Sequence, residues 1–196
     1  MIKPPALKPN ATIGILSPSS WMSESDLKKA VSVFENKGYN LVLGESIFLM
    51  DNTYAGTPEQ RANDINGMFA NPDIHIIICA RGGYGANRVL PLLDYDLIKA
   101  NPKIFMGYSD ITALLISITQ KTDLITFHGP MLTTFKNGMV DYNFNLMEKT
   151  LSGDKNIVIQ PPTDLPMKVL KSGNASGPLL GGNLCLLVNR LGSKDQ

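Results

Sequence analysis

The sequence predicts an α/β protein built on an open, mostly parallel sheet. Two observations carry this prediction. Strand-like and helix-like segments alternate along the chain, and residues 74–80 (Ile-His-Ile-Ile-Ile-Cys-Ala) are nearly continuously apolar, as a central parallel strand covered by helices on both faces requires. Because ligands bind in such sheets beyond the carboxyl ends of the strands, we expect the functional site at that edge.

Short signals place the ends of the predicted elements. Ser23, with Asp26 three residues later, resembles a helix cap, and Gly38 supplies the stop for that helix. Thr57, followed by proline and then by glutamine at the box position, opens a second helix. The predicted strands cover residues 12–17, 40–43, 74–80, 103–108 and 124–128, and two further helices cover 110–121 and 142–151.

The alternation stops at a proline-rich stretch. We therefore divide the chain into an α/β domain of residues 1–160, a linker of residues 161–166 and, over residues 167–196, the beginning of a second domain. This last part holds a short strand candidate at 167–171 and an apolar helix that ends near Gly192. About thirty residues are too few for an independent core, so the sequence predicts a truncated second domain.

Composition and charge exclude several classes of function. The formal net charge is +1 and basic residues are scattered, so no nucleic-acid partner is expected. The first ten residues lack the apolar stretch of a signal peptide, and no later apolar run could span a bilayer, which predicts a cytoplasmic protein without a membrane partner. Cys79 and Cys185 lie in separate apolar stretches and are expected as buried free thiols. With only two histidines in the chain, we expect neither a metal centre nor a cofactor.

Three segments follow predicted strands and should converge at one edge of the sheet. They are residues 81–85 (Arg-Gly-Gly-Tyr-Gly), 107–110 (Gly-Tyr-Ser-Asp) and 127–130 (Phe-His-Gly-Pro). Ser109 lies where a strand turns directly into a helix, the position of a nucleophile elbow. A helix N-cap is the alternative for Ser109, and Ile111 stands where the G-x-S-x-G elbow has its second glycine.

Residues 81–85, which we call the glycine loop, offer unhindered backbone amides beside a strand end. Such amides suit an oxyanion hole or a phosphate cradle, although a plain tight turn has the same composition. Arg81 could hold a substrate carboxylate through paired hydrogen bonds, or serve only as a surface residue. We expect Gly82, Tyr84 and His128 to line the same pocket, with a structural, hydrogen-bonded histidine as the alternative for His128.

Four ordered motifs together resemble those of the LD-carboxypeptidase family of serine peptidases, and the opening Ile-Gly-Ile-Leu-Ser-Pro-Ser of residues 13–19 resembles the family's first strand. The motifs are Ala-Arg-Gly-Gly-Tyr-Gly at 80–85, Met-Gly-Tyr-Ser-Asp-Ile-Thr at 106–112, His-Gly-Pro-Met at 128–131 and Gly-Pro-Leu-Leu-Gly-Gly-Asn-Leu at 177–184. The resemblance covers essentially the whole chain. It implies an amidotransferase-like, flavodoxin-like amino-terminal domain followed by a smaller carboxyl-terminal domain, usually in a homodimer.

The resemblance also implies a reaction and its residues. Ser109 would be the nucleophile of a metal-free Ser-Glu-His triad, and the amides of Gly83 and Asp110 would form the oxyanion hole. The substrate would be a murein tetrapeptide, whose terminal D-alanine is released from an L-centre during peptidoglycan recycling. Related members cleave a peptidyl-nucleotide antibiotic and confer immunity to it.

The chain departs from the family pattern in one respect. The family's Glu and His follow the serine in that order, whereas here only Glu148 follows Ser109 among glutamates and no histidine follows His128. The sequence therefore predicts that residues 1–196 lack the triad Glu and His and are inactive alone. A noncatalytic ligand-binding remnant is one alternative, and a nucleotide-dependent oxidoreductase, suggested only by the fold and the glycine loop, is another.

Overall fold

The computed structural model describes residues 1–138, 140–155, 157–159 and 168–193. Its centre is an all-parallel sheet in the order β2-β1-β3-β4-β5, which is the flavodoxin-like order and confirms the predicted fold class. The strands are β1 (Thr12–Leu16), β2 (Asn40–Leu43), β3 (Ile76–Cys79), β4 (Ile104–Gly107) and β5 (Phe127–His128). Each lies within a segment predicted as a strand, and β5 is much shorter than expected.

Helices lie between and after the strands, and the first two begin at their predicted caps. They are α1 (Glu24–Glu35), α2 (Pro58–Ala70), α3 (Tyr95–Ala100), α4 (Thr112–Thr122), α5 (Asp141–Leu151) and α6 (Leu184–Arg190). The Ser23 side chain accepts a hydrogen bond from the Asp26 amide at the start of α1, and Thr57 and Gln60 form a reciprocal capping box on α2. Short 3₁₀ turns lie at η1 (Glu45–Phe48), η2 (Ala86–Arg88), η3 (Leu90–Leu92), η4 (Ser109–Ile111) and η5 (Leu132–Phe135).

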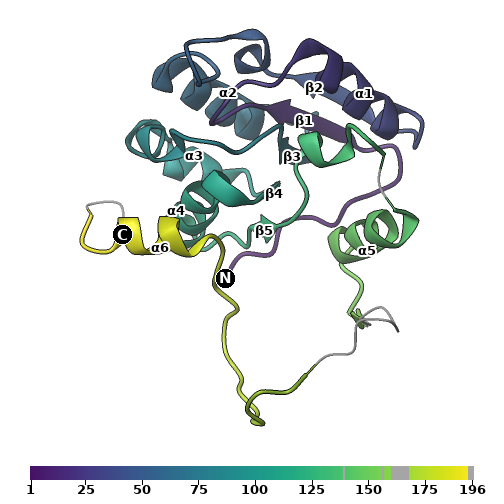
Figure 1. Cartoon of the computed structure of the whole chain (residues 1–196), viewed down its shortest axis with the longest axis vertical. Coiled ribbons are helices and arrows are strands. Elements are labelled where there is room, and N and C mark those ends of the chain that lie inside the picture. The colour runs from purple at the N-terminus through teal and green to yellow at the C-terminus, as the bar shows by residue number, and fades with distance from the viewer. Residues whose placement is uncertain (139, 156, 160–167, 194–196) are drawn as a thin grey trace.

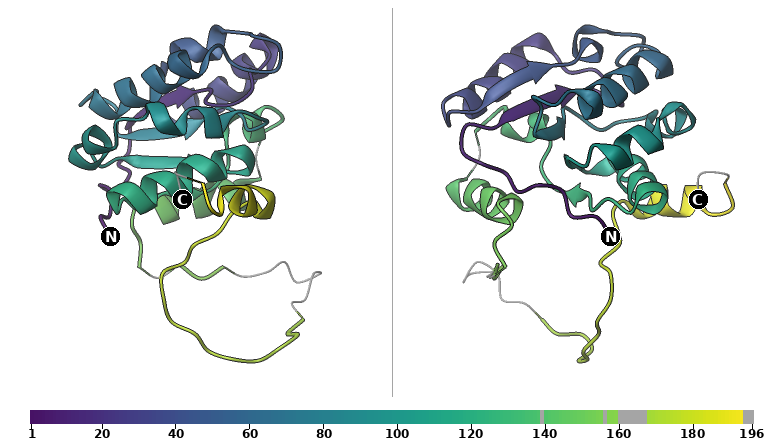
Figure 2. Two further views of the ribbon diagram at one scale, coloured as in Figure 1. Left: turned by 90° about the vertical axis from the view of Figure 1, so that its left-hand side faces the viewer. Right: turned by 180° about the vertical axis from the view of Figure 1, so that it is seen from behind.

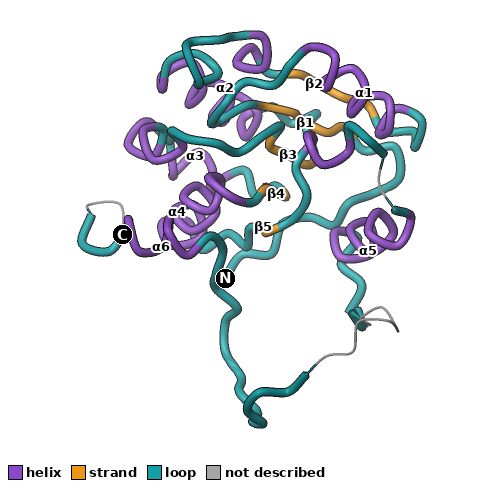
Figure 3. Tube along the Cα trace, in the orientation of Figure 1, coloured by secondary structure: helices purple, strands orange, loops and turns teal. Residues whose placement is uncertain are grey.

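Two apolar layers enclose the sheet, one on each face (Figure 1). The helices α2, α3 and α4 cover one face, whereas α1, η5 and α5 cover the other. Successive residues of β3 alternate between the layers: Ile76 and Ile78 pack with α1, and Ile77 and Cys79 pack with α2 and α4. This double coverage explains why β3 is uniformly apolar in sequence. Figure 3 shows the same layers as helices flanking a short central sheet.

The helix α6 lies against α4, the helix that follows Ser109 (Figure 2). Its Arg190 is buried, and one guanidinium nitrogen donates to the carbonyl oxygen of Ala113 at 2.5 Å. The amide of Asn183 donates to the Thr112 side-chain oxygen at 3.0 Å, so both ends of α6 are fixed to the first turn of α4. Before α6 the described residues 168–178 form an extended excursion away from the sheet (Figure 2).

Several expectations need correction. Residues 168–171, the described part of the strand candidate at 167–171, are irregular, because they pair with no other strand. α3 was not predicted, since its six residues are too few to display a helical period. Cys79 is a buried thiol whose pKa is raised by burial, but Cys185 is exposed on the outer side of α6. The proposed linker at 161–166 lies outside the described residues.

No helix in the described part of the chain has the length and apolar character needed to cross a bilayer. The outer face of α6 nevertheless carries an apolar stripe. Leu184, Val188 and Leu191 are 72%, 57% and 68% exposed. They follow one another at helical spacing and therefore share a face.

We predict that this stripe makes the 196-residue chain self-associate, because contiguous exposed apolar surface is covered when two copies meet. Replacing Leu184, Val188 and Leu191 together by glutamine should shift the chain toward monomer in sedimentation velocity. The matched control is Leu179→Gln, which replaces a fully exposed leucine outside α6. An unchanged sedimentation profile for the triple variant would assign the association to another surface.

Candidate active site

The backbone at Ser109 is held in the left-handed conformation. Its φ is +60°, whereas Tyr108 before it is extended, and Ser109 begins the turn η4 that leads into α4. A left-handed conformation at a non-glycine residue costs about 1–3 kcal/mol and persists only where the surrounding structure imposes it. The geometry is that of a sharp strand-to-helix turn that exposes a nucleophile. An ordinary N-cap has an extended backbone instead, so the simple capping interpretation of Ser109 does not fit.

Gly107 and Ile111 explain how this turn differs from a G-x-S-x-G elbow. A Cβ built on Gly107 would lie 2.7 Å from a terminal carbon of the Ile111 side chain. The isoleucine therefore fills the space above the first glycine, and both residues are fully or almost fully buried. The position of the first glycine, Gly107, therefore has no room for a side chain. The position of the second glycine, Ile111, contributes its side chain to the core.

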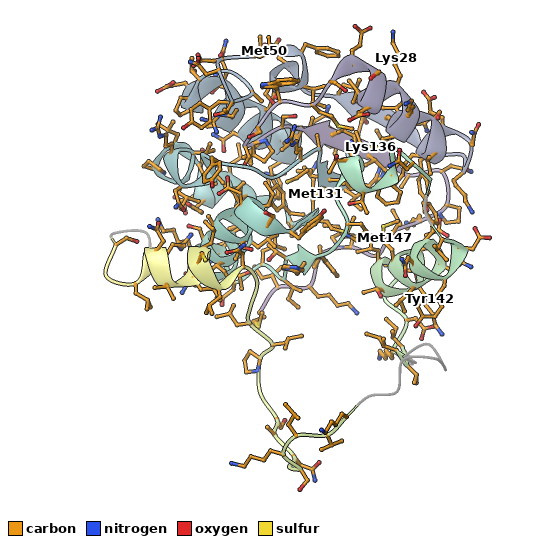
Figure 4. The ribbon with its side chains drawn as sticks, viewed as in Figure 1. Lys28, Met50, Met131, Lys136, Tyr142 and Met147 are labelled. Carbon is orange, nitrogen blue, oxygen red and sulfur yellow. The ribbon has the colours of Figure 1, made fainter. Side chains whose placement is uncertain are left out.

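The glycine loop packs directly against Ser109. A Cβ built on Gly82 would lie 3.1 Å from the Ser109 Cβ and 3.3 Å from its Oγ. Met131, which lies in the interior of the molecule in Figure 4, packs beside Ser109 over the same face of Gly82, with its terminal methyl at 3.4 Å from the same built atom. The structure thus brings together the two segments that the sequence placed at neighbouring strand ends.

Gly83 occupies a conformation that only glycine adopts easily. Its φ is +120°, and a Cβ built on it would lie 2.1 Å from the Oγ of Ser20. The Ser20 amide donates to the Gly82 carbonyl oxygen at 3.3 Å, which ties the glycine loop to the β1–α1 loop. On the other side, Asp110 lies in the first turn after the strand, where backbone amides have no partner within the helix. Amides at these two positions suit an oxyanion hole.

The side chain of Asp110 was missed by sequence reasoning, which considered only its backbone amide. The residue is buried, and its Oδ2 accepts hydrogen bonds from the Ser19 hydroxyl at 2.5 Å and the Ala86 amide at 2.9 Å. Asp110 therefore joins the Ser109 turn to the β1–α1 loop and to the end of the glycine loop. The only sequence signal for this role is that Ser19 and Ala86 follow two other strands at the same sheet edge.

Arg61 of α2 was also missed. Its side chain is 1% exposed, and one terminal nitrogen donates to the carbonyl oxygens of Pro18 at 2.9 Å and Gly85 at 3.1 Å. Burial lowers the pKa of its guanidinium, and the nearby negative charge of Asp110 acts in the opposite direction. A detectable signal existed: Arg61 lies four residues before Ile65, on the face of α2 that packs against the sheet.

The remaining predicted residues lie around this centre. Arg81 is exposed and donates one hydrogen bond, at 3.1 Å, to the carbonyl oxygen of Trp21, and Tyr84 is 74% exposed. His128 is exposed, lies opposite Gly107 in the β4–β5 register and has its ring centroid 6.3 Å from that of Tyr108.

His128 borders cavities rather than the serine. Two cavities of about 300 and 280 Å³ include it in their walls, the first together with α5 and the second together with residues 179–181, and neither is lined by Ser109. Within the described ranges, no histidine or carboxylate is hydrogen-bonded to the Ser109 hydroxyl. The site as described therefore combines a strained serine with an amide-lined loop.

The sequence profile of the LD-carboxypeptidase N-terminal domain matches residues 13–129, which include every element of the site. The chain belongs to the LD-carboxypeptidase family. Among curated relatives, it is 36% identical over 193 residues to the probable murein peptide carboxypeptidase of Bacillus subtilis, covering 97% of this chain and 60% of that protein. It is 34% identical over 219 residues to the microcin C7 self-immunity protein MccF of Escherichia coli, and the match covers 93% of this chain and 62% of that protein. The chain thus spans about 60% of the length of these LD-carboxypeptidases and their relatives.

Solved structures of the family superpose closely on this chain. The apo wild-type microcin C7 self-immunity protein MccF matches with a TM-score of 0.86 and 33% identity, over 98% of this chain and 66% of that one. Another MccF structure, with a TM-score of 0.86 and 32% identity over the same shares, is described as an active-site mutant in which a serine, an asparagine and a lysine are replaced by alanine.

In a form of the protein that contains a complete triad, we predict that Gly83→Val damages turnover, because the new side chain would collide with Ser20 and force the loop away from Ser109. Loss of one oxyanion donor typically lowers kcat by about 10² to 10³. Gly138→Val is the matched control: Gly138 has a φ of +81°, but a Cβ built there meets nothing within 4 Å. Equal kinetics for a folded Gly83→Val variant and the parent protein would place the oxyanion hole elsewhere.

Proposed function

We propose that this chain supplies the nucleophile and oxyanion hole of a serine carboxypeptidase that cleaves an L-D peptide bond. The most suitable substrate is a murein tetrapeptide, from which the terminal D-alanine is released in peptidoglycan recycling. Two relatives support this substrate class by their names. The Bacillus subtilis protein is named a probable murein peptide carboxypeptidase, and the Pseudomonas aeruginosa protein a murein tetrapeptide carboxypeptidase.

The left-handed backbone of Ser109 against the glycine loop is the observation that carries the proposal. A hydroxyl at this turn projects from the sheet edge, where it can attack a carbonyl carbon, and we assign the stabilisation of the resulting oxyanion to the amides of Gly83 and Asp110. The negative charge that forms on the carbonyl oxygen is stabilised most by donors that are already fixed before the reaction.

Arg81 is the candidate for holding the free carboxylate of the substrate. Its exposed guanidinium lies at the start of the glycine loop, and the bond to Trp21 occupies only one of its five N–H donors. The planar fork suits a carboxylate better than a lysine ammonium does. Gly82 and Tyr84 would contribute the adjacent wall, and His128 a more distant one.

The proton acceptor for Ser109 is proposed to be a His oriented by a Glu, neither of which occurs in family order within residues 1–196. A serine hydroxyl at its ordinary pKa is a weak nucleophile until a positioned base accepts its proton. We propose that the complete enzyme is metal-free, cytoplasmic and homodimeric, and that residues 1–160 and 167–196 belong to its two domains.

A microcin-type immunity peptidase is the second candidate. The 34% identity to MccF from Escherichia coli favours it, since that protein is named for self-immunity to microcin C7. The two candidates share the nucleophile and differ in the leaving group, so parallel assays with a peptide ending in D-alanine and with a peptidyl nucleotide separate them. A noncatalytic ligand-binding protein would turn over neither compound.

We predict that Ser109→Ala abolishes D-alanine release in a form of the protein that contains a complete triad. The loss of kcat should be about 10⁴-fold or more, because the hydroxyl is the attacking atom. The midpoint of thermal unfolding of the Ser109→Ala variant should be unchanged or slightly higher, because the removed hydroxyl is not needed for the fold. Ser25→Ala, which removes an exposed hydroxyl of α1, is the control. A Ser109→Ala variant that keeps a tenth of the activity would exclude Ser109 as nucleophile.

We predict that the 196-residue chain alone does not turn over a peptide ending in D-alanine, because a lone oxyanion hole gives at most weak residual catalysis. The measurement compares the purified chain, verified by intact mass, with and without a separately produced carboxyl-terminal portion of a family member. Full turnover by the chain alone, lost on His128→Ala, would show instead that residues 1–196 carry a complete site.

A further inference from the structure

Two loops meet at the Ser109 turn, and one buried carboxylate connects them. The Asp110 side chain accepts a hydrogen bond from Ser19 of the β1–α1 loop and another from the amide of Ala86, directly after the glycine loop. Asp110 also follows Ser109 in the chain. The position of its carboxylate therefore constrains the backbone on the carboxyl side of the strained residue.

A buried cation connects the same two loops a second time. Arg61 donates to the carbonyl oxygen of Pro18, the residue before Ser19, and to that of Gly85, the residue before Ala86. Its Nε also donates to the Thr57 carbonyl oxygen of its own helix at 3.2 Å, which fixes the guanidinium relative to α2. Neighbouring residues of both loops are thus held from two elements, α2 and the Ser109 turn.

Burying the charged side chains of Arg61 and Asp110 costs free energy, and this cost is explained if the two side chains hold the loops in a particular geometry. Charged groups transferred from water to a protein interior lose several kcal/mol of hydration each, and apolar side chains of similar size often stabilise a fold equally well. At the same time the left-handed turn at Ser109 requires surroundings that leave it no alternative. The two side chains supply such surroundings, because each forms hydrogen bonds both with the β1–α1 loop and with the end of the glycine loop.

We propose that Asp110, through its side chain, and Arg61 are positioning residues that fix the glycine loop at a constant distance from Ser109. Neither side chain is assigned contact with substrate. Together they keep the Gly83 amide and the Ser109 hydroxyl in register, so their loss should lower the rate of the chemical step more than it weakens substrate binding. The kinetic consequence rests on the proposed function, whereas the fixing of the loop does not.

Lys103 provides a matched control for Arg61. It is also a buried cation, and its Nζ donates to the carbonyl oxygens of Asn71 and Ile74. These contacts lie at the amino ends of β3 and β4, the opposite edge of the sheet from Ser109. Lys103→Met and Arg61→Met therefore delete the same kind of interaction, and only the second deletion touches the site.

The first test is hydrogen exchange on the 196-residue chain, which requires no activity. Arg61→Met and Asp110→Leu should each increase exchange in residues 81–86 and 107–111 on the order of tenfold, through local opening of the two loops. Lys103→Met should increase exchange near residues 71–75 and leave the site unaffected. If Asp110→Leu, which branches like aspartate but accepts no hydrogen bond, leaves both site segments as protected as in the parent chain, the proposed fixing is wrong.

The second test is kinetic and uses a form of the protein with a complete triad. Per folded molecule, Arg61→Met and Asp110→Leu should lower kcat about 10- to 100-fold with KM within about twofold of the parent value. Lys103→Met should lower the unfolding midpoint with kcat unchanged. If all three variants lose only stability, Arg61 and Asp110 are structural residues and the positioning role is overturned. A parent protein that hydrolyses neither peptide would contradict the proposed function, and hydrogen exchange would then decide the loop fixing by itself.

Discussion

The chain passes from β4 into α4 through a single left-handed residue, Ser109, and the rest of the site is arranged around that turn. A strand and a helix can be joined in many relaxed ways. The strained one is present because the glycine loop lies against one side of the serine, Ile111 fills the space over Gly107, and Asp110 is anchored to two other loops. Each contact removes an alternative path of the backbone, and the hydroxyl remains at the sheet edge.

Much of this could be predicted from the sequence. The apolar run of β3, the caps of α1 and α2 and the alternation of elements were sufficient for a parallel sheet, because each signal has a local physical cause. The meeting of the glycine loop with the Ser109 turn followed from the same reasoning, since loops at the carboxyl ends of neighbouring parallel strands must converge, whereas the roles expected of Ser109, Gly83 and Asp110 rested on the family resemblance. Ser109 and the glycine loop do lie together, as that argument required.

Other features could not be predicted, because they depend on contacts between distant segments. The helical period places Arg61 on the buried face of α2, but its partners, the carbonyls of Pro18 and Gly85, come from distant segments and could not be inferred from that period. The exposure of Cys185 depends on which face of α6 meets α4, and Arg190 rather than the apolar stripe turned out to face inward. The apolar composition of α6 had suggested instead that the apolar side chains face inward and Arg190 faces the solvent.

The hydrogen bond between Ser19 and Asp110 joins residues 91 positions apart, and Arg61 reaches Pro18 across 43. Long loops close at an entropic cost that is recovered only when the distant contact forms, so such contacts depend on the assembly of the intervening strands. β3 lies between β1 and β4 in the sheet, so the Ser19–Asp110 hydrogen bond joins the loops that follow two strands separated by a third. We therefore expect the strained geometry of the serine to form only once these three strands have paired, so that a partly folded chain would carry an ordinary, relaxed serine.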